Sequence, residues 1–418
     1  MSKLPPGSEK RKGIIAMKKV ASILLIVAML FCAVASAEIA KEDMKIGLIC
    51  LHDENMGYDA NFIDSMKAAL ENLGLDESQL VIKTNVPESQ EAYDAAADLA
   101  DMGCKYVFAD SFGHEDYIIQ AASEFPEVQF SHATGTKAQS TGLENYHNAF
   151  ASIYQGRFAA GVAAGLKLNE MIAAGKITED QAVVGYVGAF PYAEVISGYS
   201  STFLGIRHVC PTATMVVKFT NSWGDQALEQ EAANALISKG AVLMSEHADT
   251  VGAPTACEDN GVPNVAYNID FSAVAPNTAL VSSKINWTPY MQKAIEATMK
   301  GESFPTDISL GMADGAVELT ELNPNVAAEG TVEKVQEVLE QLASGELQVF
   351  DTSTFTVNGM SAEEYVQTED YLQDTANGGF NAAVHQIAAG YVKDGYFHES
   401  EFQSAPYFDL PIDGITMG

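Results

Sequence analysis

The sequence is poor in positive charge. Its 418 residues include 23 lysines and arginines against 56 aspartates and glutamates, and the formal net charge is −33. Nucleic acids and anionic membrane surfaces are bound through basic patches, so this shortage argues against both as partners. With 47% hydrophobic and 19% charged residues the composition is that of a globular chain, and its length suits two packed domains.

Cysteine is also scarce, and none of the five cysteines belongs to a C-x-x-C pair, which argues against a metal knuckle or a redox motif. Four cysteines lie beyond residue 37, and an even number permits disulfides in an oxidising compartment. Isolated buried thiols are the alternative. The four are Cys50, Cys104, Cys210 and Cys257.

The common catalytic signatures are absent as well: no G-x-S-x-G, no G-x-x-x-x-G-K-[ST] and no H-E-x-x-H. His247 with Asp249, and the run His398–Glu401, have ligand-type side chains, but both are short and are better interpreted as polar turns. We therefore expect no catalytic residue, no metal and no cofactor.

The first 37 residues form a leader. Lys18-Lys19 precede an apolar run at 20–34, and Ala35-Ser36-Ala37 gives an A-x-A cleavage pattern, so a secretory signal peptide is predicted and Met17 is an alternative start. Cys32 raises the alternative of a lipid anchor, although it follows Phe31 rather than a small residue. The expected location is the periplasm or the outer face of the plasma membrane.

Strands alternate with helices along the next part of the chain. Continuous apolar runs predict strands buried on both faces, and amphipathic stretches between them predict helices, which together imply right-handed crossovers and a parallel sheet. The predicted strands are 45–51, 80–86, 105–110 and 128–133, and the predicted helices are 59–74, 91–102 and 115–124.

The same alternation begins again after a helix at 151–170 that is rich in small residues. The strands predicted in this second half are 182–189, 214–220, 241–247 and 264–268. Residues 134–150, 269–279 and 308–319 lack periodicity and are predicted to cross between the halves. The strand 280–285 and the helix 287–300 are assigned to the first half, and the helix 332–342 to the second.

The resulting fold class is α/β, with two doubly wound parallel-sheet lobes joined by a three-crossing hinge. Lobe 1 is expected to comprise 42–147 plus 281–318, and lobe 2 to comprise 148–280 plus 319–350. Residues 351–418 form a C-terminal extension whose aromatic-rich end, 404–415, is too apolar for a free tail and is expected to pack on the lobes.

Polar and aromatic side chains follow many of the predicted strands. Ligands of open α/β sheets bind outside the carboxyl ends of the strands, so these positions predict a small-molecule site between the lobes. Aromatic rings supply stacking faces, while carboxylates and amides accept hydrogen bonds from ring N–H groups or hydroxyls. The candidate ligand-binding residues are Asp53, Asn55, Tyr58, Ser111, Phe112, His132, Phe190, Trp223, Asp225, His247, Asp249, Asn268, Asp270 and Lys284.

Several stretches resemble the Bmp (basic membrane protein), or PnrA-like, family of ABC-transporter substrate-binding proteins. The resemblance runs in order over about residues 44–350. It is carried by Gly57-Tyr58, Tyr154-Gln155 with Gly161 and Ala164, VGYVGAFPYAEVISGY (184–199), NSWGDQALEQEAA (221–233), GAVLMSEHADTVG (240–252), YNIDFSAVAP (267–276) and SSKINW (282–287).

The resemblance implies a type I periplasmic-binding-protein fold that closes over its ligand. It implies a purine nucleoside stacked between aromatics at the positions of Tyr58 and Trp223, with Asp249, Asp270 and Lys284 at polar positions. Where nucleoside-binding members have Asp-Lys-Ser-Phe-Asn, this chain reads Asn-Met-Gly-Tyr-Asp at 55–59. Ligand identity is therefore less determined than fold.

We therefore expect a monomeric, non-enzymatic component of an ABC importer that delivers a nucleoside, or a similar heteroaromatic ligand, to a membrane permease and its ATPase. A ligand sensor of the same fold that signals to a membrane receptor is the alternative. A flavin and a sugar remain alternative ligands. Lys284, one of few cations, is expected either to pair with Asp270 or Asp249 or to contact the ligand.

Overall fold

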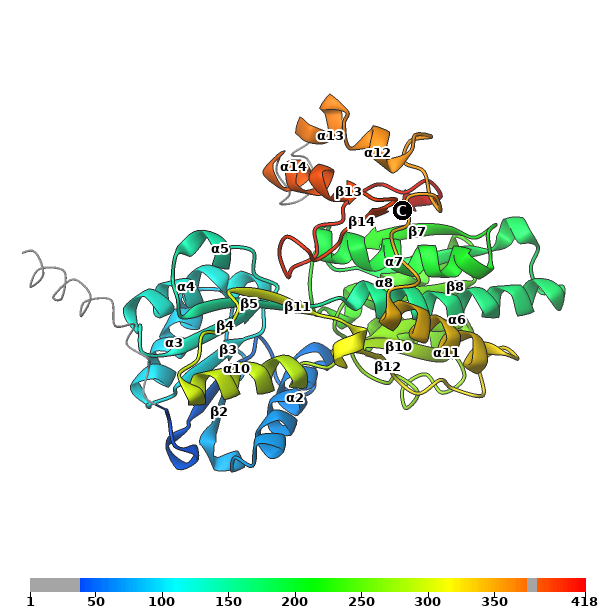
Figure 1. Ribbon diagram of the computed structural model, residues 1–418. Helices are drawn as coiled ribbons and strands as arrows, with labels where there is room; N and C mark the ends of the chain where they lie inside the picture. Colours follow the sequence, from blue (N-terminus) through cyan, green and yellow to red (C-terminus); the bar gives the residue numbers. More distant parts are fainter. Residues whose placement is uncertain (1–37, 374–381) are drawn as a thin grey trace, which may run out of the picture.

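The computed structural model describes residues 38–373 and 382–418, which form two α/β lobes and a C-terminal extension (Figure 1). The predicted signal peptide and Cys32 lie outside the described residues. Among the described residues, no helix combines the length and the apolar character needed to cross a membrane.

Lobe 1 is built on a six-stranded parallel sheet in the order β11-β5-β4-β3-β1-β2. Helices α2 and α10 cover one face through Phe62, Trp287 and their neighbours, while α3 and α4 cover the other. The strands are β1 (Ile46–Ile49), β2 (Leu80–Lys83), β3 (Tyr106–Ala109), β4 (Gln129–Ala133), β5 (Tyr146–Ala151) and β11 (Asp307–Leu310). The helices are α2 (Gly57–Leu73), α3 (Gln90–Asp101), α4 (Glu115–Glu124), α5 (Ala138–Thr141) and α10 (Thr288–Lys300), with short 3₁₀ turns η1 (Lys41–Asp43), η2 (Glu77–Gln79) and η3 (Phe112–His114).

Lobe 2 has a seven-stranded sheet in the order β12-β10-β9-β8-β6-β7-β15, parallel except for β12. The strands are β6 (Val183–Gly188), β7 (Thr214–Phe219), β8 (Leu243–His247), β9 (Asn264–Tyr267), β10 (Ala279–Ile285), β12 (Val317–Leu319) and β15 (Ile415–Met417). The helices are α6 (Ile153–Ala173), α7 (Ala193–Val209), α8 (Gln226–Ser238), α9 (Gly252–Asn260) and α11 (Thr331–Ser344), with η4 (Glu179–Gln181) and η5 (Met312–Asp314).

The small residues of α6 let it approach α7 closely, as expected from the sequence. A Cβ added at Gly161 would lie 2.2 Å from the carbonyl oxygen of Thr202, and one added at Gly205 would lie 2.0 Å from that of Phe158. Both glycines are therefore required by the contact between the two backbones. Helices α6 and α7 together form the layer against one face of the lobe 2 sheet.

The structure corrects two assignments near the hinge. Residues 146–151 are not a crossing but strand β5 of lobe 1, and residues 279–285 belong to the lobe 2 sheet rather than to lobe 1. The chain therefore crosses between sheets after β5, between β10 and α10, and between β11 and β12. The prediction that 269–279 is a crossing is also wrong and follows from the second error, because this segment joins β9 to its neighbour β10 within lobe 2.

Both errors have physical causes. Strand β5 contains His147 and Asn148, which interrupt the apolar pattern, yet both are buried and bonded: His147 to the Pro305 carbonyl and Asn148 to Glu115. For β10 the pattern predicts a strand correctly, but the choice between two parallel sheets depends on contacts distant in sequence.

The extension packs mainly on lobe 2. Its elements are α12 (Ala362–Tyr365), α13 (Glu369–Gln373), α14 (Ala382–Tyr391), the hairpin β13 (Val392–Lys393) and β14 (Tyr396–Phe397), and β15. Phe408 stacks on Phe350 at a centroid distance of 4.0 Å, and β15 adds a parallel strand beside β7. The aromatic-rich end is buried here, with Tyr407 1% and Ile412 1% exposed.

The four cysteines at 50, 104, 210 and 257 are buried free thiols. The isolated-thiol alternative therefore holds, and the lobes are stabilised by packing without a disulfide among these residues.

Candidate functional site

The carboxyl ends of the strands of both sheets face a cleft between the lobes. Lobe 1 contributes the loops after β1, β3 and β4, and lobe 2 contributes the loops after β6, β7 and β8 together with the end of β9. The cavity there has a volume of about 370 Å³, which includes its open mouth. The centre of a water-sized sphere can occupy only about 20 Å³ of that volume. The latter is room for about one water, so a larger ligand requires side-chain or lobe movement. The lining residues are Leu51, His52, Tyr58, Ser111, Phe112, Thr134, Glu194, Trp223, His247, Asp249 and Tyr267.

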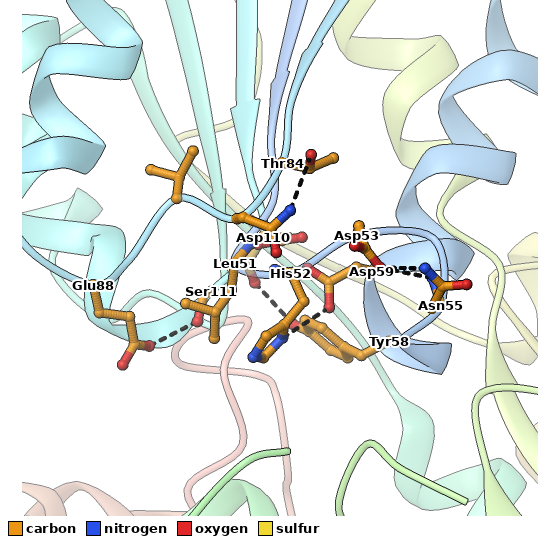
Figure 2. Close-up of polar contacts among 12 residues, drawn as sticks. Leu51, His52, Asp53, Asn55, Tyr58, Asp59, Thr84, Glu88, Asp110 and Ser111 are labelled. Carbon is orange, nitrogen blue, oxygen red and sulfur yellow. Dashed lines mark hydrogen bonds and ion pairs between the residues drawn. The ribbon is translucent and has the colours of Figure 1, made fainter. Parts of the chain in front are cut away.

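The lobe 1 wall is held by hydrogen bonds that reach back into the sheet (Figure 2). Tyr58, in the first turn of α2, donates its hydroxyl to the Asp110 carbonyl at 2.9 Å and packs its ring on Phe62. Ser111 donates its hydroxyl to Glu88 Oε1 at 2.7 Å. The Tyr58 ring is therefore fixed as one face of the cleft.

Two buried carboxylates, Asp59 and Asp110, lie behind this wall. Asp59 accepts the His52 backbone N–H at 2.7 Å and lies 3.3 Å from His52 Nδ1, while Asp110 accepts the Leu51 N–H at 3.1 Å (Figure 2). Burial, and then the charge of Asp59, raise the pKa of Asp110 well above its usual range. The hydrogen bond that the His52 ring donates to the Asp59 carboxylate raises the pKa of His52.

With Cys50, these two aspartates form a group whose ligand-type atoms lie within 4.8 Å of one another. Both oxygens of Asp59 already face His52, and Oδ1 of Asp110 accepts the Leu51 N–H. This bonding favours a hydrogen-bonded cluster that shapes the loop after β1.

The lobe 2 wall is aromatic. The Trp223 ring meets Phe190 edge-on at a centroid distance of 5.1 Å, and Phe190 stacks on Tyr192 at 5.1 Å. The Trp223 carbonyl accepts the Asp249 N–H at 3.0 Å, which ties the loop after β7 to the loop after β8. The aromatic wall thus has a fixed position relative to Asp249.

Beside it lies a set of ionisable groups. His247 Nε2 lies 3.4 Å from Glu194 Oε1, and burial lowers the pKa of His247 to about 4, so its imidazole is neutral near pH 7. Burial, followed by the charge of Asp59 across the cleft, raises the pKa of Asp249. Arg157 is buried behind this wall with its guanidinium 3.8 Å from the centroid of the Tyr267 ring.

The lobes touch at the mouth of the cleft. Phe112 of lobe 1 stacks on Tyr192 of lobe 2 with centroids 5.3 Å apart and ring planes 26° apart. A Cβ at Gly224 would lie 2.5 Å from Cε of Met56, a residue of the opposite lobe. The two lobes are therefore in direct contact here, through the Phe112–Tyr192 ring pair and through Met56 beside Gly224.

Six of the residues expected from the sequence line this cavity: Tyr58, Ser111, Phe112, Trp223, His247 and Asp249. Phe190 supports Trp223 from the side, and His132 lies beneath the wall with Nε2 2.7 Å from the Ser111 carbonyl.

The other expected residues have local structural contacts outside the cavity lining. Asp53 accepts hydrogen bonds from Asn55, and Asp225 caps α8 by accepting the Leu228 N–H at 3.0 Å. Asp270 is exposed and accepts from Ser272.

Lys284 pairs with neither Asp270 nor Asp249. It lies 3.4 Å from Glu318, its cross-strand partner on β12. Asn268 follows β9 with a φ of 69° and is buried.

Five lining residues were not anticipated: Leu51, His52, Thr134, Glu194 and Tyr267. Thr134 follows β4 with a φ of 65°, a left-handed conformation that is costly for a β-branched residue and that marks functional sites. Glu194 lies in the first turn of α7, where its charge is favourable for the helix, so the sequence offers a structural explanation for it.

Comparison with known proteins supports this fold. A family model described as "ABC transporter substrate-binding protein PnrA-like" matches residues 46–353. A purine-binding protein of Brucella abortus (strain 2308) is 29% identical over 344 residues, which cover 82% of this chain and 92% of that protein. A Haloferax volcanii protein assigned as the glucose-binding component of an ABC transporter is 32% identical over 249 residues, 60% of each chain.

Solved structures show the same fold. An ABC transporter solute-binding protein of Aeropyrum pernix K1 has a TM-score of 0.62 at 14% identity, covering 84% of this chain and 98% of its own. One from Conexibacter woesei has a TM-score of 0.59 at 22% identity, covering 73% of this chain and 98% of its own. The predicted two-lobed periplasmic-binding-protein fold is thereby confirmed.

Proposed function

Because the chain belongs to the PnrA-like family of ABC transporter substrate-binding proteins, we propose that it binds a nucleoside, most favourably a purine nucleoside, in the cleft between its lobes. A substrate-binding component of an ABC transporter has a small-molecule ligand and acts with a membrane permease and its ATPase. Families of this kind bind solutes and do not catalyse reactions.

The observation that carries the proposal is the pairing of aromatic rings from both lobes with carboxylates at one cavity. Tyr58 and Phe112 come from lobe 1 and Trp223 from lobe 2, so a planar ring entering between them meets aromatic faces on both sides. Glu194 and Asp249 offer oxygen atoms that accept hydrogen bonds from ring N–H groups or ribose hydroxyls. A purine nucleoside supplies all of these groups.

Charge narrows the ligand class further. Asp249 and Glu194 line the cavity on lobe 2, with Arg157 buried behind them, and Asp59 and Asp110 lie behind the lobe 1 wall. A phosphate would add negative charge beside these carboxylates at a cost in free energy. We therefore propose that the ligand carries no phosphate.

The proposed location is outside the cytoplasmic membrane, where such a protein captures the ligand by closing its lobes and hands it to the permease. Import is favoured over sensing because the matched family is that of transporter components. A sensor would use the same cleft and the same closure.

A thermal-shift screen tests the ligand. Adenosine, guanosine, inosine, uridine, cytidine, AMP, riboflavin and glucose are compared, each at a millimolar concentration. A ligand at about 100 times its Kd adds about 2.7 kcal/mol of stability, which is a readily measured rise in Tm. We expect a rise with at least one purine nucleoside and a smaller one or none with AMP.

A flat result with all five nucleosides would refute the nucleoside proposal. Glucose is the second candidate, because the Haloferax volcanii relative is assigned as a glucose-binding protein and aromatic and carboxylate side chains also bind sugars. A shift with glucose alone would replace the nucleoside with a sugar while leaving the transport role intact.

A further inference from the structure

The C-terminal extension does more than cover lobe 2. Its body belongs to that lobe: β15 pairs with β7, Phe408 stacks on Phe350, and Tyr371 donates its hydroxyl to Asp409 at 2.7 Å. The extension begins at residue 351, close to residue 353, where the family match ends. One of its loops nevertheless reaches the other lobe.

Residues 398–407, here called the interlobe strap, contact lobe 1 beside β11. Gln139 of α5 donates its side-chain N–H to the Phe402 carbonyl at 2.6 Å. Ser404 donates its backbone N–H to Asp307 Oδ1 at 2.8 Å, and Gln139 also lies 3.3 Å from Asp307 Oδ2. In Figure 1 this red loop extends from the extension toward β5 and β11.

The conformation of the strap is held by hydrogen bonds within it. The Tyr407 hydroxyl accepts the backbone N–H groups of Glu401 and Phe402 at 3.2 and 3.3 Å and donates to the His398 carbonyl. Glu399 is buried and accepts the Tyr407 N–H at 3.1 Å. Displacement at one end of the strap is therefore transmitted to the other.

On the side of lobe 2, the strap meets the hinge itself. Tyr154, in the first turn of α6 just after the first crossing, donates its hydroxyl to the Glu399 carbonyl at 3.5 Å and packs its ring on Phe350. The strap thus contacts the two lobes on either side of a crossing.

The geometry points to the strap as a fourth, non-covalent connection that restrains rotation of the lobes about the hinge. Asp307 lies three residues before the end of β11, so roughly 10 Å separates it from the crossing at 3.3 Å per residue. A rotation of about 20° about an axis through that point and perpendicular to β11 would displace Asp307 by about 3.5 Å, more than these hydrogen bonds tolerate. The strap contacts must therefore break when the lobes rotate by that amount.

The position of the strap explains why it can act without touching the ligand. Strand β11 is the edge of the lobe 1 sheet, two strands away from β4, three from β3 and four from β1, whose loops line the cleft. The restraint acts on the angle between the lobes, whichever small molecule binds.

Double electron–electron resonance on the full chain tests this without a ligand. Glu71→Cys on α2 and Glu333→Cys on α11 are exposed labelling positions on opposite lobes, the native cysteines 50, 104, 210 and 257 are buried, and Cys32 is replaced by serine in every variant. We expect Gln139→Ala and Asp307→Ala to broaden the interlobe distance distribution relative to the otherwise unchanged labelled protein. Gln139 is exposed, so its variant should fold even if Asp307→Ala does not.

Asp413→Ala is the matched control. The Asp413 carboxylate also accepts a backbone N–H, that of Gly359 at 2.8 Å, but its side-chain bonds stay within the extension. We expect its distance distribution to match the reference protein. If the distance distribution kept its width in Gln139→Ala, or broadened equally in Asp413→Ala, the proposal that the strap restrains lobe rotation would be wrong. Because no ligand is present, either result is independent of the proposed nucleoside.

Discussion

At the scale of single residues, the cleft joins aromatic faces to carboxylates that are shielded from water. Shielding raises the pKa of both Asp110 and Asp249, so each favours a proton or a hydrogen-bond donor as neighbour. A ligand rich in N–H and O–H groups supplies such donors. Asp249, which lines the cavity, is therefore suited to the ligand class proposed above.

Trp223 allows a direct optical test at this scale. The chain has two tryptophans, and the other, Trp287, is buried in the lobe 1 core. Stacking of a base on Trp223 should quench its emission, so we expect saturating purine nucleoside to change the fluorescence of the natural protein. Trp223→Phe should retain binding with little fluorescence change, and Trp223→Ala should weaken binding at least tenfold, about 1.4 kcal/mol.

Calorimetric titration of the three proteins separates these effects, and circular dichroism checks their folding. Equal affinity of Trp223→Ala and the natural protein would reduce Trp223 to a packing residue of the loop after β7.

At the scale of elements, loops fixed by helix caps and turns hold the site in place. Asp225 shows this: predicted as a ligand contact, it instead caps α8 and so fixes the end of the loop that presents Trp223. In the extension, an Asp394-Gly395 turn with positive φ at both residues closes the β13–β14 hairpin just before the strap.

Glu399 of the strap predicts a pH dependence of stability. Burial raises the pKa of its carboxyl from 4.5 to about 8. The folded chain therefore holds a proton between these values that the unfolded chain releases. The contribution to stability is complete below pH 4.5 and is lost as pH rises through about 8.

Glu399→Gln removes this titration while keeping the shape of the side chain. We expect its unfolding free energy to fall less steeply than that of the natural protein between pH 5 and pH 8, by at most about 1.4 kcal/mol per pH unit. Urea denaturation at each pH measures the slopes. Glu346→Gln, at an exposed glutamate, is the control, and its slope should equal that of the natural protein. If the slope of Glu399→Gln also equalled that of the natural protein, the assignment of this pH dependence to Glu399 would be contradicted.

At the scale of the whole molecule, function depends on how two lobes meet. Phe112 and Tyr192 stack across the cleft, Gly57 faces Ile269, and Gly224 faces Met56, so side chains from both lobes fill the mouth. The strap acts at the far edge of the same pair of lobes. The interlobe contacts at the cleft mouth and the strap contacts that restrain the lobes therefore lie at different places.

A larger side chain at Gly224 should obstruct closure. We expect Gly224→Val to lengthen the mean interlobe distance and to weaken ligand binding, because its Cβ alone would lie 2.5 Å from Met56 Cε. The folding of each lobe should be preserved, since the contact lies between lobes. Gly390→Ala is the control, because no heavy atom lies within 4 Å of its added Cβ. Unaltered distance and affinity in Gly224→Val would show that Met56 moves aside freely.

The predicted elements agree with the structure where apolar periodicity is clear. Helix α4 has the predicted bounds, 115–124, and the strands that carry the cleft loops lie within or close to their predicted ranges. Periodicity fails at β5, since its buried His147 and Asn148 are polar and find their partners only in the folded chain.

The sequence by itself determined the order of strands and helices, the α/β class and the location of the site at strand ends, because these follow from local pattern and from the geometry of parallel sheets. Tertiary structure alone decided that β10 lies in lobe 2, that Lys284 pairs with Glu318, and that Glu194 and Tyr267 join Trp223 in the cleft. The same holds for the strap, which brings Ser404 to Asp307. These contacts join residues distant in the chain, and their free energy depends on burial and charge that no local pattern records.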